Sequence, residues 1–392
     1  MLTRSAVGEF FMPQSMYRII ILLVVTSLLM VSCSTDKTPA AVHVMTIDTD
    51  INKGIERYIE RGINQAQKYQ ARAIVLRINT PGGSIDSTKL IVSKIFASSV
   101  PIITWVGPSG SEAMSAGTFI TMSGHIATMA PSTTIGAATP IQSNGEDIEG
   151  ILGTKIMNST AAFGRGIAEI RNRNTGWIEK AVFDGASANT NEALNLGIID
   201  HIAVDIDDAL FQVQDNTVQV ADGISIDLDV FGHAQVINSM NFYERGLQII
   251  SDPTILSLLL FAGIAGITIE FLSPGSIFPG VVGIIALLAS FLGVGTLLPG
   301  EAAIAFILLG IALLVLEFTA GSGGIFATGA IVSLALGQAI AIGQASTELD
   351  LTRILLATSA ILITILAFIA VLLFIVGKKY YAPTHDYGSK QN

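Results

Sequence analysis

The chain has 392 residues, of which 51% are hydrophobic and only 13% are charged, and its formal net charge is −10. Soluble domains carry about 25% charged residues, so this composition is typical of a membrane protein, here of roughly two or three structural units. The negative balance argues against nucleic acid as a partner. The single cysteine, Cys33, excludes an internal disulfide, and the five scattered histidines show no metal-ligand spacing, so we expect no metal and no cofactor.

Residues 1–33 predict a signal peptide or an N-terminal anchor. Arg18 precedes the apolar run 19–31, which at 13 residues is short for a membrane span but fits the apolar core of a signal peptide. Small residues follow, among them Cys33, which is a candidate for lipidation. Ordinary cleavage and an uncleaved anchor are the alternatives, and all three place the next domain, residues 34–250, outside the cytoplasm.

From residue 42 onward, short apolar runs alternate with amphipathic segments. This alternation predicts β-α-β units and hence a parallel sheet covered by helices. The expected strands are residues 42–47, 73–78, 100–106, 125–129, 218–220 and 224–228. The expected helices are residues 53–70, 85–96, a short helix after Ser115, 153–171 and an interfacial helix at 240–250. The polar residues 131–149 predict a loop. Sites in parallel sheets gather at the carboxyl ends of the strands.

The segment after the third strand carries the candidate nucleophile. Residues 108–120 read Pro-Ser-Gly-Ser-Glu-Ala-Met-Ser-Ala-Gly-Thr-Phe-Ile, which places Ser115 near a helix start. Free N–H groups and the helix dipole favour negative charge there, as a nucleophile that creates an oxyanion requires. Alternatively, Ser115 is only a small residue packed between helix and strand. Ser84, Ser109 and Ser111 are rival nucleophiles, but Ser84 follows a glycine turn and no helix starts directly behind the other two.

A glycine pair ends the second strand, in the sequence Asn-Thr-Pro-Gly-Gly at residues 79–83. Paired glycines allow a tight turn and a close approach of the backbone to a ligand. The backbone N–H groups of Gly82 or Gly83 and of Ala116, the residue after the nucleophile, are candidate oxyanion donors. Otherwise, a Pro-Gly-Gly sequence marks an ordinary turn.

A serine nucleophile needs a base, and a lysine serves where burial lowers its pKa toward neutrality. Two lysines, Lys155 and Lys180, lie between Ser115 and the first membrane segment. Lys180 follows Glu179 on an expected exposed helix face, which favours Lys155, but the residue pattern alone leaves both open. His125 lies on an expected strand only ten residues past the serine, and we predict that it is structural.

Residues 251–378 carry few charges and predict an all-α membrane domain of about five helices, each close to the length that crosses ~30 Å of hydrocarbon. The expected spans are residues 254–272, 278–298, 302–318, 324–343 and 354–377. Glu270 and Glu317, near span ends, are expected at the interface or packed between helices. The lysine pair 378–379 after the last span predicts that residues 379–392 form a short cytoplasmic tail.

Together these motifs resemble those of the NfeD family, the nodulation-formation-efficiency D proteins, which are membrane-bound serine proteases of the ClpP class. The resemblance covers about residues 42–203 and the membrane segments. It depends on residues 79–83, 113–118, 129–137, 191–194 and 197–200. It implies an α/β ClpP/crotonase-like spiral of ββα units, a dyad of Ser115 and Lys155, and Asn158 as a further matching residue. The catalytic histidine of ClpP would fall near residues 137–140, which contain none, and this supports a lysine base.

The resemblance implies a membrane-anchored serine endopeptidase that cleaves hydrophobic peptide segments, for instance those of stomatin/prohibitin-like membrane proteins. It further implies a homo-oligomer, a dimer or larger, embedded as a multi-pass protein in the lipid bilayer of a bacterial-type inner (plasma) membrane. We expect an extracytoplasmic protease domain and no OB-type barrel after the spans. The alternatives are a non-catalytic scaffold for stomatin-like proteins, a signal-peptide-peptidase-like protease, and an acyl-CoA-binding crotonase, which has no need of Ser115.

Overall fold

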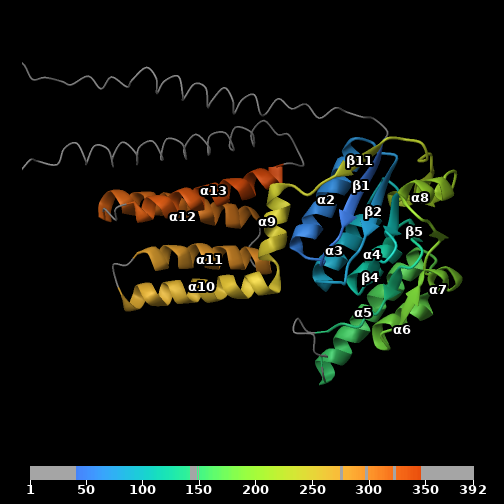
Figure 1. Cartoon of the computed structure of the whole chain (residues 1–392), viewed down its shortest axis with the longest axis horizontal. Helices are drawn as coiled ribbons and strands as arrows, with labels where there is room; N and C mark the ends of the chain where they lie inside the picture. Colours follow the sequence, from blue (N-terminus) through green and yellow to red (C-terminus); the bar gives the residue numbers. More distant parts are fainter. Residues whose placement is uncertain are drawn as a thin grey trace, which may run out of the picture. The chain divides into compact units, whose positions relative to one another are not determined.

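The structure, a computed structural model, describes residues 41–141, 148, 150–273, 277–295, 299–320 and 324–345 (Figure 1). The expected signal peptide with Cys33, the fifth expected span at residues 354–377 and the C-terminal tail lie outside the described residues.

A six-stranded parallel sheet forms the centre of the N-terminal part of the chain (Figure 1). The strands, in spatial order, are β11 (Gln235–Asn238), β1 (Val42–Ile47), β2 (Ala73–Ile78), β3 (Ile102–Val106), β5 (Ile126–Met129) and β8 (His201–Ile202). Each neighbouring pair is parallel. Strands β1, β2, β3 and β5 are buried almost throughout, because both faces of the sheet are covered, and this explains why the sequence shows them as continuous apolar runs.

One face of the sheet packs against helices and forms the larger core. These helices are α2 (Lys53–Lys68), α3 (Ile85–Phe96), α4 (Ala116–Ser123), α5 (Gly150–Ile170) and α6 (Thr175–Phe183). Their buried side chains, such as Tyr58 and Phe119, join Leu76 and Ile78 of the sheet in one cluster. The other face packs against α8 (Ile206–Val213) and a hairpin of β9 (Thr217–Gln219) and β10 (Ser225–Asp227).

Three short strands form a second sheet beside the first. They are β4 (Glu112–Met114), β6 (Thr134–Gly136) and β7 (Ser187–Asn189), which precedes α7 (Thr190–Asn195). The prediction of a loop over residues 131–149 is therefore wrong for β6. Its three residues are too few to show an alternating pattern, and they are ordered by pairing with β4 and β7. This sheet matters for function because β4 leads directly into α4 and fixes the turn between them.

Helix α9 (Phe242–Ile250) confirms the helix expected at residues 240–250, and four apolar helices follow it. They are α10 (Pro253–Leu272), α11 (Phe278–Val294), α12 (Pro299–Ala320) and α13 (Ile325–Ala345). Among the described helices, α10 and α12 are long and apolar enough to cross a membrane, whereas the apolar stretches of α11 and α13 are shorter. The helices pack in pairs, α10 with α11 and α12 with α13.

Small and polar residues hold these pairs together. A Cβ on Gly266 would lie 2.3 Å from the Pro279 carbonyl oxygen, so α10 and α11 approach each other closely there. Buried Glu317, near the end of α12, accepts hydrogen bonds from the N–H groups of Gly324 (3.0 Å) and Ala327 (3.3 Å) at the start of α13. Its carboxyl group is thus packed between helices, as expected.

Candidate active site

Ser115 occupies the sharp turn between β4 and α4. Its φ of 48° and ψ of −110° lie outside the regions that residues with a side chain usually adopt. The residue is held there because its N–H donates to the carbonyl oxygens of Gly136 (3.2 Å) and Ala137 (3.1 Å). Its Oγ makes no hydrogen bond to any described residue, and the side chain is only partly buried. A strained strand-to-helix turn that presents an unpaired hydroxyl group is the geometry of a serine nucleophile.

Thr118 supports this turn from inside α4. Its buried Oγ1 lies 2.9 Å from the carbonyl oxygen of Ala113 in β4 and 3.3 Å from that of Gly136 in β6. The hydroxyl group therefore ties the helix to both strands that flank Ser115. Thr118 belongs to the motif at residues 113–118, but a threonine within a run of small residues does not show by itself that its hydroxyl group supports the turn.

The glycine pair lies directly beside Ser115. Gly82 and Gly83 have φ values of 128° and 144°, which favour glycine. The Gly82 N–H donates to Thr80 Oγ1 (3.2 Å) and is therefore occupied. In contrast, the N–H groups of Gly83 and Ala116 donate to no group in the part of the chain that the structure describes. Of the three candidate oxyanion donors, these two are available.

Ile51 orients the Gly83 backbone. The Ile51 N–H donates to the Gly82 carbonyl oxygen (2.7 Å), and the Ser84 N–H donates to the Ile51 carbonyl oxygen (2.8 Å). This pattern is a parallel bridge between Ile51 and Gly83. In such a bridge, the two residues that flank Gly83 make both bonds, so its own N–H and C=O point away from Ile51. A side chain at Gly83 would also collide with Ile51, since a Cβ there would lie 2.2 Å from the Ile51 carbonyl oxygen.

The structure does not join either candidate base to Ser115. Lys155 lies in the first turns of α5, where its side chain is exposed, and no hydrogen bond links its Nζ to Ser115 Oγ. Asn158, one turn further along, is also exposed. Apart from Gly153, the buried residues of α5 begin only at Thr160.

Lys180 on α6 is also exposed, so burial favours neither lysine. The rival nucleophiles have other surroundings. Ser84 caps α3, because its Oγ accepts the Ser87 N–H (3.3 Å). Ser111 is buried, whereas Ser109 is exposed in the loop before β4.

His125 lies just before β5, at the amino ends of the parallel strands, whereas Ser115 follows β4, which pairs with Thr80 beyond the carboxyl end of β2. Its Nδ1 accepts the Ile102 N–H (3.1 Å), and its buried Nε2 has no partner among the described residues. Burial, with a smaller contribution from the nearby Arg171, lowers the pKa of His125 from 6.5 to about 3. The ring is therefore neutral at physiological pH, and this placement agrees with a structural role.

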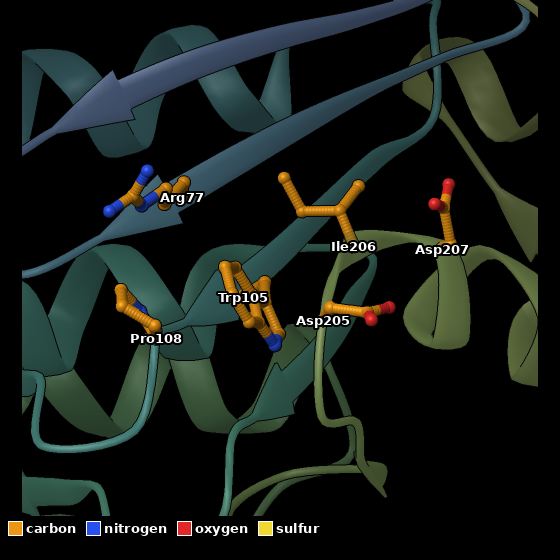
Figure 2. A pocket seen from close by; sticks show the side chains of 6 residues that line it. All are labelled: Arg77, Trp105, Pro108, Asp205, Ile206 and Asp207. Carbon is orange, nitrogen blue, oxygen red and sulfur yellow. The ribbon is translucent and has the colours of Figure 1, made fainter.

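A pocket of about 310 Å³ lies on the sheet face that carries α8, away from the face covered by α4 (Figure 2). It is lined by Arg77, Trp105, Pro108, Asp205, Ile206 and Asp207. Figure 2 shows Arg77 and Pro108 on one side of the Trp105 ring and the two aspartates on the other. Asp205 accepts the Asp208 N–H (2.8 Å) and Asp207 accepts from Gln235 Nε2 (2.6 Å), so both carboxylates have local partners. In the described part of the chain, no cluster of three or more His, Cys, Asp or Glu side chains is placed to hold a metal ion.

Comparison with known proteins decides the family. Residues 41–196 match the N-terminal domain of NfeD1b, and residues 254–376 match the NfeD integral membrane domain. The chain is 30% identical over 308 residues to the membrane-bound protease PH1510 of Pyrococcus horikoshii, a match that covers 76% of this chain and 68% of that protein. The chain belongs to the NfeD family.

Two further relatives agree with this assignment. The membrane protein NfeD1b of Bacillus subtilis is 25% identical over 325 residues, which are 78% of this chain and 69% of that protein. The solved 1510-N domain of a membrane-bound stomatin-specific protease, a lysine-to-alanine mutant in complex with a substrate peptide, is 30% identical. It matches with a TM-score of 0.50 over 53% of this chain and 96% of that one. The expected fold is thereby confirmed, as a ClpP-like α/β domain followed by a helical membrane domain in an NfeD-family membrane protein.

Proposed function

We propose that this NfeD-family protein is a membrane-anchored serine endopeptidase with Ser115 as its nucleophile. The observation that carries the proposal is the strained turn at Ser115, which presents an unpaired Oγ beside the glycine pair. Similarity to the protease PH1510 supports the same conclusion.

In this proposal, Ser115 Oγ attacks the carbonyl carbon of the scissile peptide bond and its proton passes to a base. The N–H groups of Gly83 and Ala116 donate hydrogen bonds to the oxyanion. The C–N bond then breaks, the amine leaves with the proton, and water hydrolyses the acyl-enzyme ester. Gly82 contributes by its lack of a side chain, which lets the loop lie against the nucleophile.

We assign the role of base to Lys155, with Lys180 as the alternative. Resemblance to the NfeD family supports Lys155, and so does the similar 1510-N protease, whose lysine-to-alanine mutant holds a substrate peptide. Because Lys155 is exposed in the single chain, we propose that a second copy of the chain covers the first turns of α5. The neighbouring Ile151 and Leu152 are 78% and 63% exposed and are suited to such an apolar contact. Exclusion of water from this surface favours the neutral amine that a base requires.

For the substrate, we propose a hydrophobic segment of a stomatin/prohibitin-like membrane protein, because the similar 1510-N protease is described as stomatin-specific. In the proposed topology, residues 1–33 are a signal peptide or anchor, and residues 34–250 form the extracytoplasmic protease domain. Residues 251–378 cross the bilayer and residues 379–392 are cytoplasmic.

A scaffold for stomatin-like proteins is the second candidate, since an exposed Lys155 without a hydrogen bond to Ser115 is what a non-catalytic domain would also show. The deciding experiment treats the full-length protein in detergent with a serine-reactive fluorophosphonate and with a panel of apolar peptides. We expect labelling at Ser115 and peptide cleavage, both lost in Ser115→Ala. Wild-type protein that neither labels nor cleaves would establish the scaffold instead.

A further inference from the structure

Helix α9, which directly precedes the membrane helices, is joined to α2 of the N-terminal domain by specific contacts. Arg61 forms a bidentate ion pair with Glu244, with distances of 2.5 Å from Nε to Oε1 and 2.9 Å from Nη2 to Oε2. Glu244 is buried, and the Tyr58 hydroxyl group donates to the carbonyl oxygen of Asn238, just before α9 (2.5 Å). A paired geometry with little exposure makes this a strong contact.

The contact extends to the first turn of α2. A Cβ on Gly54 would lie 2.6 Å from the backbone of Gln248, so the two helices touch there through their main chains. Asn52 joins them as well. Its Oδ1 caps α2 by accepting the N–H groups of Gly54 (3.0 Å) and Ile55 (3.2 Å), and its Nδ2 donates to the Gln248 carbonyl oxygen (3.4 Å).

Asn52 adjoins Ile51, the residue that orients the glycine pair. Through its two backbone hydrogen bonds, Ile51 turns the N–H of Gly83 away from itself. A continuous set of contacts therefore runs from Gln248 in α9 through Asn52 and Ile51 to Gly83. The other hydrogen bonds to the backbone of residues 82–84 are local, to Thr80 in the same loop and to Thr88 in the first turn of α3, so among the described residues Ile51 is the contact from a separate segment.

We infer that Asn52 is a positioning residue, through which α9 holds Ile51 and so fixes the direction of the Gly83 N–H. The inference rests on the proposed function, because it concerns the oxyanion donor of that reaction. Hydrogen bonds to an oxyanion form only as the tetrahedral intermediate develops, so a misdirected donor lowers kcat and leaves KM almost unchanged. It follows that the activity of the N-terminal domain depends on the docking of the helix that leads into the membrane.

Asn52→Asp and Asn52→Ser test this inference in the full-length protein. Both substitutions keep a side-chain oxygen that caps α2, and both remove the amide donor to Gln248. Removal of one oxyanion-hole donor typically lowers kcat by a factor of about 10²–10³. For a misdirected donor we expect roughly a tenfold fall in kcat, with KM within about twofold of wild type. The matched control is Asn189→Asp, at the N-cap of α7, where the side-chain oxygen also accepts two N–H groups. It should keep wild-type kcat.

A second pair of variants tests the docking itself. Gly54→Ala places a methyl group against the Gln248 backbone, whereas Gly246→Ala places one where nothing lies within 4 Å. We expect the first to lower kcat and the second to leave it unchanged.

If wild type cleaves and Asn52→Ser retains its kcat, the positioning role is overturned while the protease assignment stands. A parallel rise in KM and fall in unfolding temperature, without a specific loss of kcat, would also overturn it, because that pattern indicates a purely structural residue. Absence of any wild-type labelling or cleavage would instead remove the proposed function.

Discussion

Gly82 and Ser115 approach each other so closely that a Cβ on Gly82 would lie 2.7 Å from the Ser115 Cβ and 3.2 Å from its Oγ. Gly82 lies in the loop after β2 and Ser115 in the turn after β4, and the two are brought together because Thr80, two residues before Gly82, pairs with Ala113 of β4. This juxtaposition places the glycine pair in the immediate surroundings of the proposed nucleophile.

Gly82→Ala should therefore abolish the proposed protease activity. The methyl group would push Ser115 aside, and the φ of 128° would strain any residue with a side chain. We expect peptide cleavage and fluorophosphonate labelling to fall by at least about 100-fold, which is the effect of removing one oxyanion-hole donor from a serine hydrolase. Gly110→Ala is the control, since its φ of 88° is also positive but nothing lies within 4 Å of the new Cβ. It should lose about 1 kcal/mol of stability and keep its activity. Normal labelling of Gly82→Ala would contradict the role given to this approach.

Substitution of Ser115 separates catalysis from backbone strain. Ser115→Ala and Ser115→Gly should both lose labelling and cleavage, because both lack the hydroxyl group. Only glycine adopts a φ of 48° with a ψ of −110° without strain, and such strain costs about 1–3 kcal/mol. We therefore expect Ser115→Gly to unfold at a higher temperature than Ser115→Ala. Ser109→Ala, in the exposed loop, should resemble wild type in both measurements. Equal unfolding temperatures for the two Ser115 variants would show that the turn is unstrained.

The two lysines are distinguished by peptide cleavage measured from pH 6 to 10. With Lys155 as base, Lys155→Ala should lose at least about 100-fold in kcat, within the range of a general base, while Lys180→Ala keeps wild-type activity. Wild type should gain activity as pH rises, because the base must be deprotonated. Loss of activity in Lys180→Ala alone would transfer the role to Lys180.

His125 should make the fold sensitive to acid. Its pKa is 6.5 in an unfolded chain and about 3 in the folded one, so between these values the unfolded chain binds a proton that the folded chain does not. The contribution of the neutral His125 ring to the free energy of unfolding is therefore fully present above about pH 6.5 and is lost progressively as pH falls toward 3. At pH 5 the loss amounts to about 2 kcal/mol.

The measurement compares unfolding temperatures at pH 7.5 and pH 5 for wild type and His125→Gln, whose amide oxygen can still accept the Ile102 N–H. The fall in unfolding temperature from pH 7.5 to pH 5 should be smaller in His125→Gln than in wild type. It should be unchanged in His201→Gln, a control at a partly exposed histidine on β8. An unchanged difference in His125→Gln would show that this ring does not control acid stability.

Strands β1, β2, β3 and β5 could be predicted to within two residues, because a buried parallel strand is a continuous apolar run. The strands β4, β6, β7, β8 and β11 could not, since each has only two to four residues and is ordered by partners distant in the sequence. Local pattern contains no signal for such pairing.

The residues of the candidate site also divide into those that the sequence predicts and those that only the fold shows. Ser115 and the glycine pair belong to short motifs that the sequence displays directly. Ile51 and Thr118 act through hydrogen bonds to segments that only the fold brings near them, so their supporting roles could not be predicted, although Thr118 belongs to the motif at residues 113–118. The residue pattern leaves Lys155 and Lys180 both open as the base, the preference for Lys155 depends on the family resemblance, and the contact that would make it a base stays a prediction.

Glu317 has a consequence for how the membrane domain is made. Its two oxygens each accept a hydrogen bond from an N–H group at the beginning of α13, so these two donors are synthesised after the helix that carries the acid. A carboxyl group left in hydrocarbon without those donors is costly. We therefore expect α12 to be integrated into the bilayer together with α13, as a hairpin that the insertion machinery releases in one step. Chains released after residue 323 should accordingly insert α12 into the bilayer less completely than chains that extend to residue 345.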